Sequence, residues 1–118
     1  MTLEFQYVLS TIDNNYYFTP TSFSVVPEAP NKETENQGAC RVLAFSKEHD
    51  LDMEPTLKLF AEHYRNVLDN PTANTHPNIR MIMKYGLAQV HFGKMPLERK
   101  PTYSATEIAR LIEHVSQH

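Results

Sequence analysis

The segment Thr21-Ser-Phe-Ser-Val-Val26 carries the clearest strand signal in the chain, and it separates an α+β fold from an all-helical one. β-Branched and aromatic residues favour strands because they pack well on a pleated surface. Pro20 stands just before the segment, where its missing N–H removes no central ladder bond. We therefore predict a short strand over residues 21–26, followed by a polar loop over residues 27–37.

A second short strand is predicted over residues 87–93. Ala88, Val90 and Phe92 alternate with polar residues, which is the period of a half-buried strand, and Gly93 ends the pattern. We expect the two strands to pair, which would tie the N-terminal third of the chain to the C-terminal third.

Two helices are predicted in the first half of the chain. Apolar residues recur at helical spacing over residues 3–14, and Thr2 can cap that helix. The apolar residues over Ala39–Lys47 are nearly continuous, so both a strand and a helix fit that segment. We prefer a helix there, because a polar turn and a clear helix follow.

A third, longer helix is predicted to follow Asp52 as its N-cap and to end before Asn70. Its apolar stripe predicts that Phe60, Tyr64 and Leu68 lie on the buried face. This helix would span more than four turns without interruption.

Two more helices complete the prediction. The fourth has Thr75 as its N-cap, turns Met83 inward and ends at Gly86 in the left-handed conformation. The fifth opens with Ser104-Ala-Thr-Glu107, which is a capping box, and then shows an apolar stripe.

Length and composition indicate one compact α+β domain over residues 1–118, with these five helices and two strands. A chain of 118 residues buries roughly two thirds of its unfolded surface, so it needs no disulfide or metal to fold. Cys40 is the only cysteine, which excludes an internal disulfide and fits a reducing compartment such as the cytoplasm. The N-terminus shows no secretory signal pattern.

The charge balance and the hydropathy exclude two classes of partner. The formal net charge is −3, whereas general nucleic-acid binding needs a basic face that neutralises phosphates. The helices around residues 49–51 have the outline of a helix-turn-helix, but Glu54 and Glu62 would repel DNA. No apolar run approaches the ~20 residues that cross a bilayer. We therefore expect neither a nucleic-acid partner nor a membrane partner.

His76, Asn78 and Arg80 form the first candidate ligand-binding site, in the first turn of the predicted fourth helix. His76 and Arg80 are i, i+4 neighbours, so their side chains share one face. His76 can serve as a general base or a ligand, and Arg80 can hold an anion near the free N–H groups of the helix N-terminus. In the alternative interpretation, Arg80 pairs with an acid from another helix and His76 supports the start of its own helix.

Tyr64, Arg65 and Cys40 are the other candidates. Tyr64 belongs to a buried stripe and needs a partner for its hydroxyl, while Arg65 can meet an acid from a neighbouring helix. Cys40 stands at a predicted helix start, where a thiol pKa is lowered, although a buried cysteine in an apolar niche is the commoner case. The histidines lack zinc-motif spacing, so neither a metal nor a cofactor is predicted.

Four segments of the chain resemble the sequence motifs of a known protein family. They are Ile12-Asp-Asn-Asn-Tyr-Tyr-Phe-Thr-Pro-Thr-Ser-Phe23, Asn36-Gln-Gly-Ala-Cys-Arg41, Tyr64-Arg-Asn-Val-Leu68 and His76-Pro-Asn-Ile-Arg80. In this order they resemble the motifs of the HopJ type III effector family over about residues 3–97. The resemblance implies a bacterial origin and a name taken from secreted effectors of plant pathogens. It implies no known chemistry.

The chain departs from the family pattern at three places. Thr75 stands where the family usually has an acid before the histidine, and Leu87 stands where it usually has a tryptophan. If the acid orients the histidine, its loss weakens a catalytic role for His76. The family also usually begins with a short amphipathic helix, which this chain lacks. We expect the C-terminal helix over residues 104–115 to cover the apolar surface that the missing helix would cover.

The leading hypothesis is therefore a small bacterial HopJ-like protein that binds a protein or a small anionic ligand, in the cytoplasm or after type III secretion. One alternative is a small enzyme that uses His76 with Arg80, Arg65 and Tyr64 as anion or oxyanion stabilisers. Another is a structural module whose terminal helix mediates self-association, so a monomer and a weak homodimer both stay open. Convergence of the four side chains in one pocket would favour the enzyme or a ligand-binding site.

Overall fold

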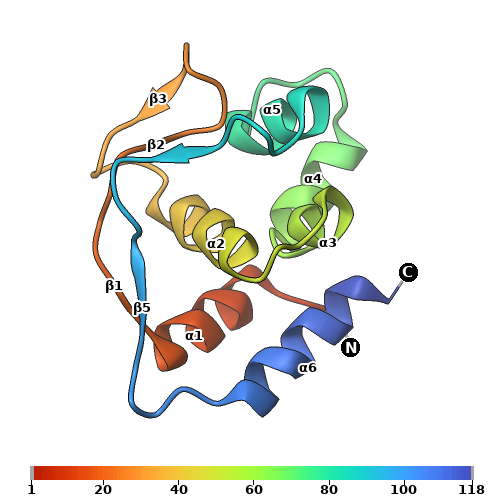
Figure 1. Ribbon diagram of the computed structural model, residues 1–118. Helices are drawn as coiled ribbons and strands as arrows, with labels where there is room; N and C mark the ends of the chain where they lie inside the picture. The colour runs from red at the N-terminus through yellow and green to blue at the C-terminus, as the bar shows by residue number, and fades with distance from the viewer. Residues whose placement is uncertain (1, 118) are drawn as a thin grey trace.

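The computed structural model describes residues 2–117, and this part of the chain folds into six helices and five short strands (Figure 1). The helices are α1 (Phe5–Asn15), α2 (Gln37–Glu48), α3 (Met53–Lys58), α4 (Glu62–Asp69), α5 (Pro77–Tyr85) and α6 (Ala105–Ser116). The strands are β1 (Tyr16–Phe18), β2 (Phe23–Ser24), β3 (Pro30–Asn31), β4 (His91–Phe92) and β5 (Leu97–Arg99). The predicted α+β class is confirmed.

The central element of the fold is α2, which the other helices surround (Figure 1). It packs against α1, α3 and β5. Its side chains are buried on several sides, as the exposure of Val42, Leu43, Ala44 and Phe45 at 2% or less shows. A helix enclosed in this way needs no polar face. The nearly continuous apolar run over residues 39–47 is therefore a buried helix, as predicted.

The predicted pairing of the two strand segments is also confirmed. β2 lies between β3 and β4 in one antiparallel sheet, with Phe23 opposite Phe92 and Ser24 opposite His91. The rings of Phe23 and Phe92 stack at 6.5 Å between centroids. Each strand has only two residues, so the sheet is shorter than predicted, and β3 lies inside the segment that was predicted to be loop.

A second antiparallel sheet, β1 with β5, was not predicted. It begins directly after α1 and places Tyr16 opposite Arg99 and Phe18 opposite Leu97. Three residues per strand give too short a stretch for a period-2 signal. Tyr16, which is 2% exposed, continues the apolar stripe of α1 into this sheet.

The prediction of one uninterrupted helix from residue 53 to residue 69 is wrong. α3 ends at Lys58 and α4 begins at Glu62, because Ala61 between them has φ +54° and ψ −123°. The apolar spacing continues across this break, so periodicity alone does not reveal it. The break also turns the C-terminal half of the segment, and Leu68 is 51% exposed instead of buried.

The region around α5 differs from the prediction in two respects. Its N-cap is His76, with φ +51° and ψ +58°, and not Thr75, whose backbone and side-chain oxygens accept hydrogen bonds from Arg80 instead. Met83 was predicted to face inward but is 39% exposed. Gly86 ends the helix at φ +81°, which confirms the predicted positive φ, although its ψ of −166° lies outside the left-handed helical region.

The caps of the first and third predicted helices are not formed as expected. Glu4, and not Thr2, precedes α1, and it makes no side-chain capping bond. Asp52 does precede α3, but its side chain caps no backbone N–H. The capping residue that the sequence predicts correctly is Ser104, whose Oγ accepts a hydrogen bond from Glu107 N at 3.1 Å.

The C-terminal helix covers apolar surface, as expected. α6 packs against α3 and α1, and it buries Ile108, Leu111 and Val115. Thr2 and Leu3 line one hollow together with Val115, so the two ends of the described chain lie close together (Figure 1). Within residues 2–117, no helix is long and apolar enough to cross a membrane.

Replacing Ala61 with glycine should relieve backbone strain. An alanine at this positive φ stores strain of about 1–3 kcal/mol, which glycine does not. Two losses oppose this gain: the greater freedom of glycine in the unfolded chain costs about 0.5–1 kcal/mol, and removal of the buried Ala61 methyl costs about 0.8 kcal/mol. We therefore expect the free energy of unfolding, measured by urea titration, to fall by less than in the control variant Ala109→Gly.

The matched control is Ala109→Gly, in an exposed part of α6. This change should lower the free energy of unfolding by about 1 kcal/mol, because glycine is a poor helix former. Equal losses in the two variants would show that Ala61 is not strained.

Candidate functional site

The first turns of α2 and α5 meet at a cavity of about 190 Å³, which we call the histidine cavity. Neither helix has a side-chain cap, and the N–H groups of a first turn have no partner within their helix. The partial positive charges of two helix N-termini therefore lie at one cavity. The residues that line it from these two turns are Asn36, Gly38, Ala39, His76, Pro77, Asn78 and Ile79.

Four aromatic rings, including that of His76, form much of the wall. The rings of His63 and His76 are neighbours, with centroids 4.8 Å apart and a tilt of 36° between their planes. The rings of Phe5 and His63 meet edge to face with centroids 4.7 Å apart, and Phe5 stacks on Phe60 with centroids 6.1 Å apart. A Cβ on Gly38 would stand 3.0 Å from the ring of Phe5, so glycine allows this ring to cover the start of α2.

The electrostatics of the histidine cavity favour negative charge. Among the described residues, none of those that line it is acidic. Burial, and then the nearby His63 and Arg80, lower the pKa of His76 below its ordinary value, so its ring is neutral at pH 7. Helix N-termini repel cations, and within residues 2–117 no three His, Cys, Asp or Glu side chains are placed to hold a metal ion.

A network of side-chain amides, buried at Asn31 and Asn78 and exposed at Asn36, holds the two helix starts together. Asn31 Nδ2 donates to Asn78 Oδ1 at 3.0 Å, and Asn78 Nδ2 donates to Asn31 Oδ1 at 3.2 Å. Asn36 Nδ2 also donates to Asn31 Oδ1, at 2.8 Å. Asn78 lines the cavity, and its amide positions the start of α5 against the N-cap of α2. Asn31 lies in the predicted loop, where no sequence signal marks it.

Arg80 does not line the histidine cavity. Its guanidinium donates to three backbone carbonyls of the loop before α5, those of Thr75, Asn70 and Pro71, at 2.5, 2.9 and 3.3 Å. The arginine therefore fixes the loop between α4 and α5, and it pairs with no carboxylate of residues 2–117. Its i, i+4 spacing from His76 does not bring the two side chains to one site.

Tyr64 and Arg65 lie at a different hollow, beside the N-terminal segment and α6. Arg65 donates to the carbonyl of Leu3 at 3.1 Å, and its guanidinium is 4.0 Å from the Glu4 carboxylate. Burial raises the pKa of Tyr64. The predicted grouping of His76 with Arg80, Arg65 and Tyr64 in one pocket is therefore not formed.

Cys40 is fully buried in α2, away from solvent. Burial raises the pKa of its thiol to about 11, and its Sγ lies 3.7 Å from the carbonyl oxygen of Thr21. A thiol with this pKa stays protonated at neutral pH and is a poor nucleophile. The position matches the structural interpretation, a buried cysteine in an apolar niche.

The family model of HopJ type III effector proteins matches residues 1–97. The chain belongs to the HopJ family. This HopJ protein is also similar to the crystal structure of VPA0580, a protein of unknown function, with 37% sequence identity and a TM-score of 0.78. The similarity covers 83% of this chain and 82% of the other. No protein with a curated description matches the sequence.

Two of the four segments that resemble HopJ motifs meet at the histidine cavity. Asn36 and Gly38 come from the second segment, and His76 and Asn78 come from the fourth. His63, which also lines the cavity, directly precedes the third segment. His63 was not among the candidate residues, because histidines 13 positions apart have no spacing that links them. The tertiary fold of the HopJ protein brings them together.

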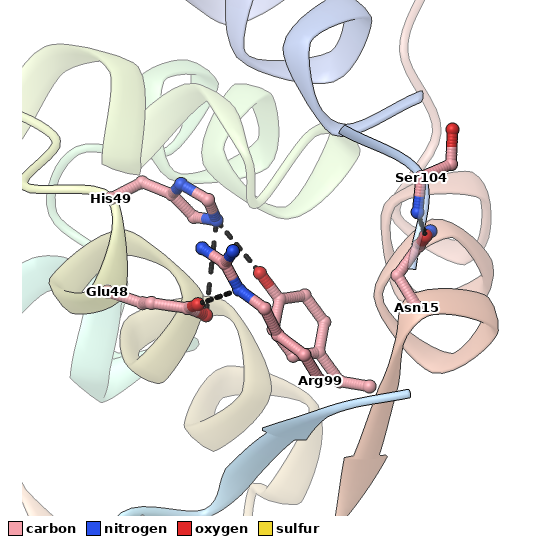
Figure 2. Close-up of polar contacts among 6 residues, drawn as sticks. Asn15, Glu48, His49, Arg99 and Ser104 are labelled. Carbon is pink, nitrogen blue, oxygen red and sulfur yellow. Dashed lines mark hydrogen bonds and ion pairs between the residues drawn. The ribbon is translucent and has the colours of Figure 1, made fainter. Parts of the chain in front are cut away.

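A second polar cluster joins the end of α2 to β1 and β5 in this HopJ protein, and it was also not predicted (Figure 2). Arg99 Nε donates to Glu48 Oε1 at 2.7 Å, and His49 Nε2 lies 2.9 Å from the hydroxyl of Tyr16. Burial lowers the pKa of His49 and raises that of Tyr16. His49 and Glu48 are 3.9 Å apart, and because burial keeps the histidine neutral we treat them as neighbours and not as an ion pair. The cluster secures the β1–β5 sheet.

Proposed function

We propose that this HopJ protein binds a small anionic ligand in the histidine cavity, with His63 and His76 as the side chains that hold it. One observation supports the proposal: two helix N-termini and two histidine rings line a single cavity that contains no acidic side chain. Free N–H groups at a helix N-terminus are good donors to phosphate, sulfate and carboxylate oxygens. A protonated His76 would add charge-assisted hydrogen bonds.

Binding is favoured over the enzymatic alternative by the placement of the side chains. The centroids of the His63 and His76 rings are 4.8 Å apart, which leaves no space between the rings for a substrate that an acid and a base would flank. Arg80, Arg65 and Tyr64, which the enzyme would need as anion stabilisers, are engaged elsewhere.

The shape of the cavity restricts the ligand to a small molecule. Its volume of about 190 Å³ is below the usual range of sites for drug-sized ligands. Phe5, Phe60 and Ile79 supply apolar wall beside the helix N-termini. A compact oxyanion, or a short carboxylate with a small apolar body, fits these surroundings. We further propose that the protein works in the reducing bacterial cytoplasm, where Cys40 stays a free thiol.

The binding proposal predicts a defined response to inorganic sulfate. In a two-dimensional NMR titration, the backbone amides of Gly38, Ala39, Asn78 and Ile79 should shift together along one binding curve. The variant His76→Asn removes the imidazole, and asparagine tolerates the left-handed backbone of position 76. We expect the sulfate Kd to rise about tenfold, which corresponds to one lost charge-assisted hydrogen bond.

The matched control for this titration is His91→Ala, at an exposed histidine outside the cavity. Its sulfate Kd should equal that of the wild type. Absent shifts at the four amides, or equal Kd values for His76→Asn and wild type, would refute the proposed site.

Sulfate binding should also strengthen as the pH falls. Burial lowers the pKa of His76 in the free protein, and a bound anion would raise it again. The affinity should therefore rise as the pH falls from about 7.5 towards the pKa of the free histidine, and level off below that value. We expect about a tenfold change in Kd over this range, since one pKa unit is one factor of ten.

Sulfate is suited to this measurement because it stays dianionic throughout, unlike phosphate. Isothermal titration calorimetry at several pH values measures how the sulfate Kd depends on pH. The His76→Asn variant should show a weaker dependence. A Kd that is independent of pH in the wild type would exclude a protonated His76 from the complex.

A further inference from the structure

Two hollows flank α5, and Arg80 and Lys84 line both of them. These two residues are i, i+4 neighbours, so they form one basic ridge along the helix. The Leu68 hollow, with a volume of about 330 Å³, contains Leu68 and Met83. The Tyr85 hollow, with a volume of about 580 Å³, contains Tyr85 on the other side.

Large apolar side chains are exposed on both sides of the basic ridge. Leu68 is 51% exposed, Met83 is 39% exposed and Tyr85 is 52% exposed. Helical periodicity predicts Leu68 and Met83 as core residues, but in the folded chain both line an open groove between α4 and α5. Exposed apolar side chains gathered beside a groove are typical of an interaction surface.

The basic ridge carries positive charge without an internal counter-charge. Arg80 is held by backbone carbonyls, which fix its guanidinium without neutralising it. Within the described residues, no carboxylate oxygen lies within ion-pair distance of Arg80 or Lys84. Glu28 lines the Tyr85 hollow, so negative charge fits best over the ridge and in the Leu68 hollow. In a chain of net charge −3, this local basic surface is complementary to acidic residues.

We propose that this surface docks a short acidic segment of another protein, in which acidic residues lie between large apolar residues. The acids would cross the basic ridge, and the apolar side chains would enter the two hollows. A second copy of this chain is a poorer occupant. In a two-fold dimer the same surface meets itself, so Arg80 and Lys84 would face the basic residues of the other copy.

The test uses a displayed library of random dodecapeptides. Peptides are selected on the wild-type protein and counter-selected on the double variant Leu68→Ser/Met83→Ser, whose two positions are exposed. The enriched sequences should carry acidic residues between large apolar ones. A synthetic peptide of the enriched sequence should bind the double variant at least about tenfold more weakly than the wild type in fluorescence polarisation. The double variant should melt close to the wild type.

Charge is tested with Lys84→Glu, and its matched control is Lys94→Glu at an exposed lysine outside both hollows. The first should weaken peptide binding about tenfold, and the second should leave it unchanged. Selected peptides without acids, equal binding to the variants, or no selective enrichment would overturn the proposal. A wild-type dimer that Leu68→Ser/Met83→Ser abolishes would also overturn it. Sulfate binding in the histidine cavity should be unaffected by all these variants, so the two proposals fail separately.

Discussion

Deletion of residues 102–118 should leave the protein largely unfolded at physiological temperature. The deletion removes α6 with its buried Ile108, Leu111 and Val115, and it exposes the facing surfaces of α3 and α1. Burial of one such aliphatic side chain stabilises a fold by about 1.5–3 kcal/mol. The loss of three is comparable with the whole free energy of unfolding of a typical domain, which is about 5–15 kcal/mol.

Circular dichroism during urea and thermal unfolding measures this effect. A second comparison uses point variants of the full-length protein. Leu111→Ala should lower the free energy of unfolding by about 2–5 kcal/mol, whereas Arg110→Ala, on the exposed side of α6, should change it by less than about 0.5 kcal/mol. A truncated protein that melts at the wild-type temperature would show that α6 is an accessory to the fold.

Asn15→Ala should cost about 2–3 kcal/mol, far more than an ordinary change at a polar residue. Asn15 is 1% exposed, and its side chain joins α1 to α6. Its Oδ1 accepts a hydrogen bond from Ser104 N at 2.7 Å (Figure 2). Its Nδ2 donates to Thr11 O at 2.7 Å and to Glu107 Oε1 at 3.2 Å. Alanine would leave the Ser104 N–H without a partner at the start of α6.

The matched control for this variant is Asn14→Ala, one residue earlier and exposed. It should change the free energy of unfolding by less than about 0.5 kcal/mol. Urea titration of both variants decides the matter. If Asn15→Ala were as mild as Asn14→Ala, water would be replacing the amide, and the junction between α1 and α6 would carry little of the stability.

Sequence patterns predicted the elements whose signals are local. Alternation marked the strand that contains Phe92, the Ser104 capping residue marked the start of α6, and a continuous apolar run marked the buried helix α2. Ala61 was missed because the break it causes preserves helical spacing, and positive φ at alanine has no sequence signal. The β1–β5 sheet was missed because its strands are too short to show a period.

The candidate site was predicted only in part, for a related reason. His76 and Asn78 were candidates because they lie in one turn at a helix start, and both line the histidine cavity. His63 comes from another helix and Asn31 from a loop, so only the tertiary fold brings them to the site. Arg80 has the right spacing for a site shared with His76, but its guanidinium donates hydrogen bonds to nearby backbone carbonyls instead.

The amide network centred on Asn31 has a consequence for the kinetics of ligand capture. Asn31 links the N-cap of α2 to the first turn of α5, so the two halves of the histidine cavity are joined before any ligand arrives. Binding of an anion to the proposed site should therefore cost little conformational entropy, and the association rate should be set by diffusion into the opening. The site should also select anions by size, because walls joined in this way do not move apart for a bulkier anion.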